Sequence, residues 1–304
     1  MALDHYVSQV HLKQFIDPEL KHLLRAYRKS NLSTFTPTTR DICRIEDWST
    51  NEFLDEPRIV ERFAQVAEPA YEESLGRLIS GNIVDKDFIT FASFAVFVIL
   101  SSPALVHTLA PIQTKVVDNL MRQMDAAGKL PASPITGHPD WDNRTTSELL
   151  KEGKIQISVN ERFPQALLTY NGGKLLDLFS NASWEIVRPF HGTSFITSDF
   201  PIAFVDRQIK GYALRFLPCS PNIGIIFALP KRIEYVTEEV MVKRVTLSRS
   251  DTVRLNRSIV MSATDIVFSS SSQNWIMPML EKYRSWRIYG SDFPDLEVGP
   301  AKRK

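Results

Sequence analysis

The stretch DKDFITFASFAVFVILSSP, residues 85–103, decides the fold of this chain. Between Phe88 and Leu100 only Thr90 and Ser93 interrupt an apolar run of thirteen residues. A bilayer span needs about 20 apolar residues in a helix, and this run is bounded by two aspartates and by Ser-Ser-Pro. It therefore predicts a central helix that is buried on all sides. Such a helix must be wrapped by other elements, which indicates a large hydrophobic core.

Helical patterns flank this central helix on both sides. Residues 56–80 place apolar side chains on one arc at 100° per residue, and a Gly-Asn pair follows as a stop signal. Pro69 lies inside this pattern and cannot donate an N–H bond, so we expect a kink or a new helix start there. Pro103 begins another helix that ends near residue 127. Together these segments form a helical subregion at about residues 56–128.

The period of the pattern changes to two in the second half of the chain. Short β-branched or aromatic runs separated by Pro, Gly and Asn predict a mainly antiparallel sheet at about residues 183–270. These runs are Trp184–Val187, Ser194–Thr197, Ala203–Val205, Tyr212–Leu217, Ile223–Ala228 and Asp265–Ser269. Additional short helices are expected at residues 145–152, 164–179, 248–263 and 274–284, and a hairpin at residues 23–29 and 34–45.

Segregated helices followed by consecutive strands are typical of the α+β class. We expect a helical layer in the N-terminal half, packed against a mainly antiparallel sheet in the C-terminal half. The pattern is consistent with a single domain over residues 1–304, with residues 300–304 as a frayed tail.

Composition excludes several classes of protein. Apolar residues make up 43% and charged residues 23%, which is the balance of a folded globular chain. The net charge of +1 does not indicate a nucleic-acid partner, although it leaves a local basic face open. Cys43 and Cys219 lack metal-type spacing and are expected to be inert thiols without a disulfide-linked partner. The first residues show no signal sequence, so we expect a cytoplasmic protein with no membrane partner.

Four motifs in order resemble one known family. The opening HYVSQVHLKQF at residues 5–15, the glutamate Glu68, the apolar helix ending at Pro103 and the strand FITSDFPI at residues 195–202 agree with its pattern. A late helix bearing Asn256 also agrees. The chain thus resembles, over nearly its whole length, the family catalogued as domain of unknown function 4238. The resemblance implies a fold and candidate positions, and it implies no reaction.

Two departures from that family pattern concern function. Relatives usually carry Arg before the Ser-Pro or Thr-Pro pair, whereas this chain has Ser101 there, and Pro69 directly follows Glu68. If that Arg orients a carboxylate or phosphate in relatives, part of a site is missing in this chain.

His5, Glu68 and Asp199 are the candidate catalytic residues. Histidine is a residue type suited to general-base chemistry or metal binding, so His5 is a candidate for either role. The alternative is that His5 only caps or packs near the terminus. Glu68 lies at the edge of the apolar arc of its helix. Its side chain either points into a groove or simply lies at the boundary between the buried and exposed faces of the helix. Asp199 lies where the chain bends before Phe200-Pro201, which presents a carboxylate or else forms a local turn.

Five further residues support this candidate site. Tyr6 and Gln9 belong to the opening motif, Thr197 and Ser198 precede Asp199, and Asn256 is either a site residue or a buried polar anchor bonded to backbone.

Two functional hypotheses follow from these residues. In the first, the protein is a hydrolase or metal-assisted nuclease in which His5, Glu68 and Asp199 converge, hold a divalent metal and activate water. In the second, it is a non-catalytic intracellular binding or regulatory protein, and the same residues lock the N-terminal segment onto the sheet. Convergence of the three side chains in an open cleft would favour the first hypothesis.

Overall fold

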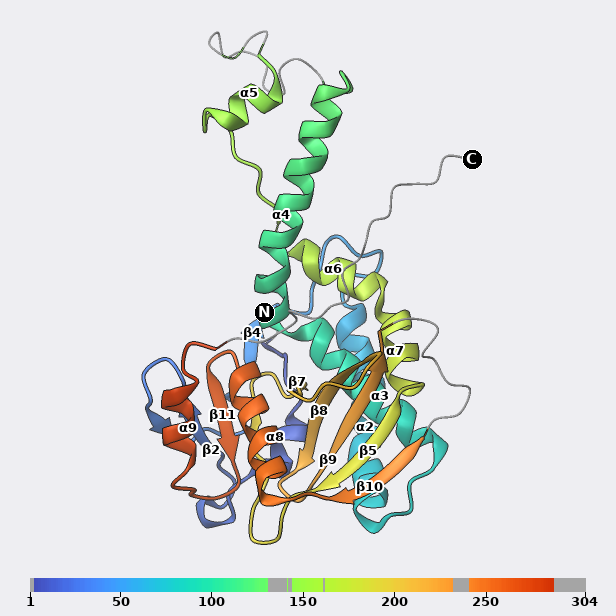
Figure 1. Cartoon of the computed structure of the whole chain (residues 1–304), viewed down its shortest axis with the longest axis vertical. Coiled ribbons are helices and arrows are strands. Elements are labelled where there is room, and N and C mark those ends of the chain that lie inside the picture. Colours follow the sequence, from blue (N-terminus) through green and yellow to red (C-terminus); the bar gives the residue numbers. More distant parts are fainter. Residues whose placement is uncertain (1–2, 131–140, 142–143, 161, 232–240, 287–304) are drawn as a thin grey trace.

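The computed structural model describes residues 3–130, 141, 144–160, 162–231 and 241–286 (Figure 1). The tail at residues 300–304 lies outside these ranges. The N-terminal elements are β1 (Leu3–His5), α1 (Gln9–Leu12), β2 (Arg25–Arg28), β3 (Thr34–Phe35) and β4 (Arg44–Glu46). The helical elements that follow are α2 (Ile59–Ser80), α3 (Asp85–Ser101), α4 (Pro103–Ala126), α5 (Thr146–Lys151), α6 (Arg162–Tyr170) and α7 (Gly172–Ser180).

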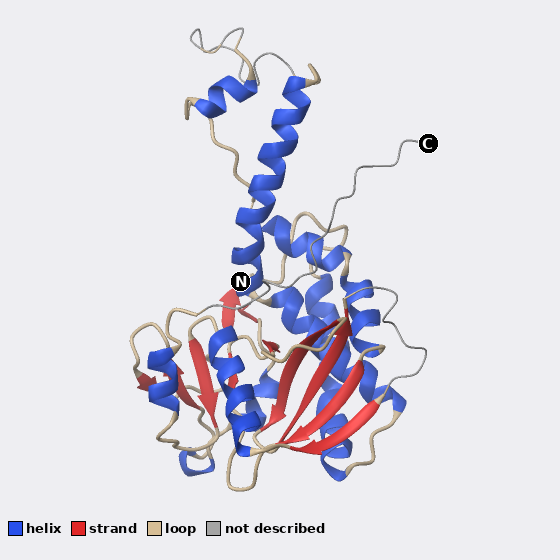
Figure 2. Cartoon of the chain, in the orientation of Figure 1, coloured by secondary structure: helices blue, strands red, loops and turns tan. Residues whose placement is uncertain are grey.

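Strands dominate the remainder of the described chain. They are β5 (Ser183–Arg188), β6 (Thr197–Ser198), β7 (Ala203–Phe204), β8 (Tyr212–Ser220), β9 (Ile223–Pro230), β10 (Val242–Thr246) and β11 (Ile266–Ser269). Two helices, α8 (Arg249–Ser262) and α9 (Ile276–Lys282), accompany them. The α+β class is confirmed: α2 to α7 precede the long strands in the chain, and Figure 2 shows the helices and strands of the molecule.

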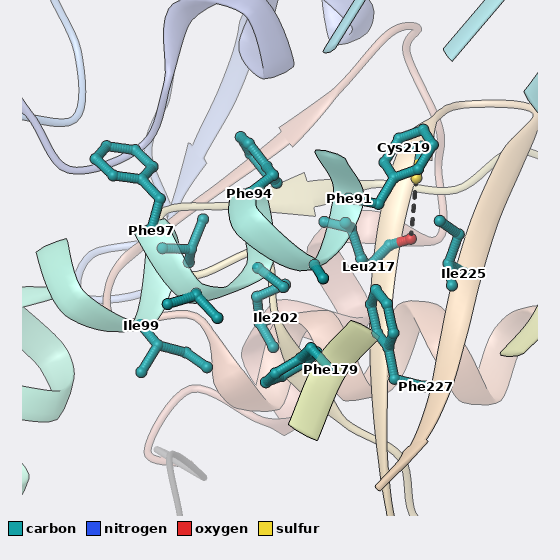
Figure 3. Close-up of a cluster of buried hydrophobic side chains, with 14 of the residues drawn as sticks. Phe91, Phe94, Phe97, Ile99, Phe179, Ile202, Leu217, Cys219, Ile225 and Phe227 are labelled. Carbon is teal, nitrogen blue, oxygen red and sulfur yellow. Dashed lines mark hydrogen bonds between the residues drawn. The ribbon is translucent and has the colours of Figure 1, made fainter. Parts of the chain in front are cut away.

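The central helix predicted from the apolar run is α3, and every residue from Thr90 to Ser101 in it is buried. It packs between α2 and α7 and against the sheet that contains β8 and β9 (Figure 1). Figure 3 shows Phe91, Phe94 and Phe97 of α3 in the same apolar cluster as side chains of α7 and of the sheet. Burial of these aromatic rings makes α3 the centre of the core.

The strands form three sheets instead of the one sheet expected. Five strands lie in the order β10-β5-β9-β8-β7, four in the order β3-β2-β11-β6, and β1 pairs with β4. All neighbouring pairs are antiparallel except β10 with β5. The mainly antiparallel sheet expected in the C-terminal half is confirmed, and β2 and β3 from the N-terminal region add to the sheet of β11 and β6.

α2 continues past Pro69 as one helix, so no new helix starts there. Pro69 and Gln65 are both exposed, so water can bond to the Gln65 carbonyl that Pro69 leaves without a helical partner. One helix prediction requires correction. The single helix expected at residues 164–179 is two helices, α6 and α7, which meet at Asn171. The period-two pattern also missed β10, an edge strand whose sequence VKRVT does not alternate cleanly.

α4 projects from the body of the molecule, and α5 lies beside its far end (Figure 1). We call this projection the arm. Only Ala104, Leu105 and Val106 are buried in α4. Three aliphatic side chains on successive turns are more than half exposed: Ile112 (54%), Val116 (61%) and Leu120 (53%).

In the described ranges, no helix by itself has both the length and the hydropathy of a membrane span. α3 and α4 meet that criterion only as a pair, and they are bent by 57° relative to each other.

Candidate functional site

The N-terminal segment that carries the opening motif lies against α2. β1 pairs with β4 so that His5 is opposite Arg44, and the Ser8 side chain then caps α1 by accepting the Val10 N–H. This strand-to-helix turn brings both His5 and Gln9 to the surface of α2. Sequence periodicity does not predict this contact, because α1 is only one turn long.

A small hollow forms where this segment meets α2, with a volume of about 190 Å³. Its lining includes three residues selected from the sequence, His5, Gln9 and Glu68. The full lining is Leu3, Asp4, His5, Gln9, Glu61, Ala64, Gln65, Glu68 and Phe97. We call it the polar hollow.

A second hollow of about 420 Å³ shares Gln65 and Glu68 with the first. Glu68 therefore lies between the two hollows. Val10 and Lys13 of the N-terminal segment and Glu72 of α2 also line the second hollow. Because these α2 positions repeat at intervals of three or four residues, they lie along one face of the helix. A polar groove thus runs along α2, beside the N-terminal segment.

His5 is held in one tautomer. Its Nε2 lies 3.1 Å from the carbonyl oxygen of Arg40, which can only accept a hydrogen bond. Nε2 therefore carries the hydrogen, and Nδ1 of the neutral ring is an acceptor. This state suits both hydrogen bonding to a ligand donor and general-base chemistry.

Asp4, a buried residue of the polar hollow, forms an ion pair with the partly exposed Arg58. The Asp4 carboxylate accepts the Ser49 N–H at 2.8 Å and lies 3.0 Å from a guanidinium nitrogen of Arg58. Asp4 is thus already neutralised by a cation. Glu61 and Glu68 are the other acidic residues in the lining, so the hollow has an excess of negative charge.

Asp199 lies elsewhere, buried within the protein with 3% of its surface exposed. Its carboxylate accepts the backbone N–H groups of Thr264, Asp265 and Ile266 at 2.8, 2.8 and 2.9 Å. Burial raises the pKa of Asp199 to about 6, although these three hydrogen bonds favour the charged form. The structure therefore brings His5 and Glu68 to one hollow and places Asp199 in a different environment.

The residues around Asp199 are also bonded within the protein. Ser198 forms a local turn with Phe200, and Thr197 Oγ1 lies 2.8 Å from Nε2 of the buried His11. Burial raises the pKa of Tyr6, whose hydroxyl bonds Cys43 and lies near Asp199. The contact between His11 and Thr197 thus ties the N-terminal segment to β6 of the four-stranded sheet.

Asn256 acts as a polar anchor. Its side-chain oxygen accepts the Ile196 N–H at 3.1 Å, and its nitrogen donates to the Ser194 carbonyl at 2.8 Å. α8 is thereby fastened to the chain that leads into β6. This arrangement matches the buried-anchor interpretation of Asn256.

Two buried polar residues were not selected as site residues from the sequence. Complete burial lowers the pKa of His11 to about 3, and its Nδ1 lies 3.1 Å from the Tyr71 hydroxyl. Lys29 is fully buried, and its ammonium group donates to the carbonyls of Val260, Ala263 and Trp286. Lys29 carries no sequence signal, because a lysine at the end of a strand usually reaches solvent.

The metal-assisted hypothesis needs a set of ligands. Within the described ranges, no three His, Cys, Asp or Glu side chains gather closely enough to hold an ion. His5 and Glu68 share the polar hollow, but Asp4 is committed to Arg58 and Asp199 to backbone N–H groups. The residues present do not fit a divalent metal.

Comparison with known proteins identifies one family. The model of the family described as "Protein of unknown function (DUF4238)" matches residues 4–273. The match includes His5, Glu68, Asp199 and Asn256. Neither a curated protein nor a solved structure matches the chain.

Proposed function

The chain belongs to the DUF4238 family, whose function is unassigned, and from its polar hollow we propose that it is a non-catalytic binding protein. The observation that carries the proposal is the placement of His5, Gln9 and Glu68 around one hollow, while Asp199 is bonded to backbone elsewhere. The lining contains no Ser, Thr, Cys or Lys that would serve as a nucleophile.

The charge of the lining supports a cationic ligand. Asp4 is neutralised by Arg58, whereas Glu61 and Glu68 have no ion-pair partner within the described residues. His5 Nδ1 adds a hydrogen-bond acceptor. A ligand bearing an ammonium or guanidinium group would satisfy these acceptors, and the adjoining hollow would take the rest of an extended molecule.

Thermal unfolding with small organic cations tests the proposal. Ethanolamine, L-arginine amide and spermidine serve as probes, and a ligand at one hundred times its Kd stabilises by roughly 2.7 kcal/mol. We expect at least one probe to raise the melting temperature of the wild-type protein. Glu68→Gln should abolish the rise, and the exposed control Glu281→Gln should retain it. An equal rise in the Glu68→Gln protein would contradict binding in the polar hollow.

A hydrolase is the second candidate, because His5 presents Nδ1 in the state of a general base. In this alternative, Nδ1 takes a proton from water and Gln9 or Gln65 donates to the substrate. Turnover of a nitrophenyl ester or phosphodiester that His5→Ala removes and the exposed control His22→Ala preserves would favour the enzyme over the binding protein.

A cytosolic location is part of the proposal. It is supported by Cys43 and Cys219, both buried and both free. Such unpaired thiols are usual in reducing compartments.

A further inference from the structure

A second hollow of different character lies beside α8, with a volume of about 890 Å³. It is bounded by the loop between β7 and β8, by the last turns of α8 and by Lys231 after β9. It shares no lining residue with the polar hollow. Its size falls within the range of small-molecule sites, which is about 300–1,000 Å³. We call it the cationic hollow.

The charged residues of this lining are mainly cationic: Arg207, Lys210 and Lys231, against the single acid Asp206. Asp206 is itself 3.7 Å from a guanidinium nitrogen of Arg257 on α8. Lys210 and Lys231 have no ion-pair partner in the described part of the chain. The hollow therefore has the opposite charge to the polar hollow.

Arg207 contributes to this hollow a buried N–H donor that has no acceptor among the described residues. One terminal nitrogen lies 3.0 Å from Glu185, but Nε is buried without a hydrogen-bond partner among the described residues. An unmet buried N–H normally indicates a missing acceptor, such as water or an anion. A phosphate oxygen would supply that acceptor.

The remaining lining suits an organic body attached to the anion. Ile209, Leu214 and Met261 supply apolar surface, and Ser258 and Ser262 supply hydroxyl oxygens. Ser262 already accepts the Phe204 N–H at 3.3 Å, so its position is fixed. An inorganic ion alone would leave most of this surface uncovered.

We propose that the cationic hollow binds an organic phosphate of nucleotide size, with its phosphate groups between Arg207, Lys210 and Lys231. Two cations from the β7–β8 loop and one from the end of β9 can neutralise a multiply charged phosphate group, and an arginine donates to phosphate oxygens in a fixed geometry. The apolar wall on Met261 and Leu214 would contact the organic part. This inference is independent of the function proposed for the polar hollow.

Calorimetric titration of the full chain with ADP at low ionic strength tests the site. The double variant Lys210→Gln/Lys231→Gln should bind ADP at least ten-fold more weakly than wild type. The double variant Lys151→Gln/Lys174→Gln removes two exposed lysines elsewhere and should bind as wild type does. Glu68→Gln should also leave ADP binding unchanged, which separates this proposal from the previous one.

Three results would overturn the inference. The first is the absence of ADP binding to the wild-type protein. The second is an equal loss of affinity in both double variants, which would show that lysine charge acts at long range. The third is displacement of ADP by a single-stranded oligonucleotide that binds more tightly, which would make the hollow part of a nucleic-acid surface. Weaker binding of pyrophosphate than of ADP would support the contact with the organic body.

Discussion

Lys29 and Asp199 both hold the turn that joins α8 to β11, Lys29 through the carbonyls of the turn and Asp199 through its N–H groups. The Lys29 ammonium group donates to the carbonyls of Val260 and Ala263 at 2.7 and 2.8 Å. The Asp199 carboxylate accepts the three successive backbone N–H groups of residues 264–266. Both side chains are buried, and together they fix the passage from α8 into β11. The carboxylate of Asp199, a candidate catalytic residue from the sequence, thus anchors the fold through backbone hydrogen bonds.

Asp199→Asn tests that anchor. An amide presents one acceptor oxygen and places an N–H₂ group against backbone donors, so at least one buried N–H loses its partner. We expect a loss of roughly 2–4 kcal/mol in the free energy of unfolding, measured by urea denaturation followed by circular dichroism. Asp177→Asn, at an exposed position, should change stability by less than about 0.5 kcal/mol. Unchanged stability of Asp199→Asn would instead revive a functional role for this carboxylate.

His11 should make the fold sensitive to acid. Its pKa is lowered to about 3 by burial, whereas in the unfolded chain it titrates near 6.5. Between these values the unfolded chain binds a proton that the folded chain does not, so this contribution to stability falls as the pH falls. The contribution of His11 to the slope is about 1.4 kcal/mol per pH unit between pH 6 and pH 4.

Asp199 acts in the opposite direction over part of this range. Its folded pKa of about 6 exceeds the unfolded value, so its contribution falls as the pH rises from about 4 to 6. His11→Gln removes the titrating ring. The slope of the unfolding free energy against pH should therefore fall by about 1.4 kcal/mol per pH unit, the effect of one proton. Urea unfolding at several pH values measures this, and His22→Gln is the exposed control. An unaltered slope would show that His11 does not supply the acid sensitivity.

The sequence predicted α3 correctly because a continuous apolar run limits both the length and the burial of a helix. The same reasoning cannot choose strand partners. β2 pairs with β11, about 240 residues later, and a period of two identifies each strand without identifying its neighbour. Long-range pairing is therefore where the predicted architecture differed from the structure.

The candidate site was predictable to the same limited extent. The opening motif directed attention to His5 and Gln9, and the helical arc directed it to Glu68; all three line one hollow. For Asp199, a bend before proline is compatible with an exposed or a buried carboxylate. The choice depends on backbone donors at residues 264–266, which no local pattern around Asp199 reveals.

The arm makes a separate prediction about packing. Val116 is 61% exposed, so Val116→Ser should change the free energy of unfolding by less than about 0.5 kcal/mol. Leu105 is buried at the base of the same helix, so Leu105→Ala should lower the free energy of unfolding by roughly 2–4 kcal/mol. Thermal and urea unfolding compare the two variants. A loss of stability in Val116→Ser as large as that in Leu105→Ala would show that the exposed aliphatic side chains of α4 are covered in solution.

Ser101 lies where the family resemblance implies an arginine, and Ser101→Arg tests whether this chain can accept one. The residue is fully buried at the end of α3, and its hydroxyl lies 2.6 Å from the Phe97 carbonyl and 3.0 Å from that of Tyr6. Ser101→Arg would place a guanidinium group there without a carboxylate in contact and would displace the N-terminal segment. We expect a loss of more than about 3 kcal/mol in the free energy of unfolding.

The conservative variant Ser101→Ala removes the hydroxyl donor that the Phe97 and Tyr6 carbonyls share and should cost only about 1 kcal/mol. Urea unfolding of the Ser101→Ala and Ser101→Arg proteins separates the energetic cost of losing the hydroxyl from the cost of burying a charge. A stable Ser101→Arg protein would mean that the N-terminal segment can move aside at this point. The polar hollow beside His5 would then be deformable, and its ligand would not be limited by the volume found here.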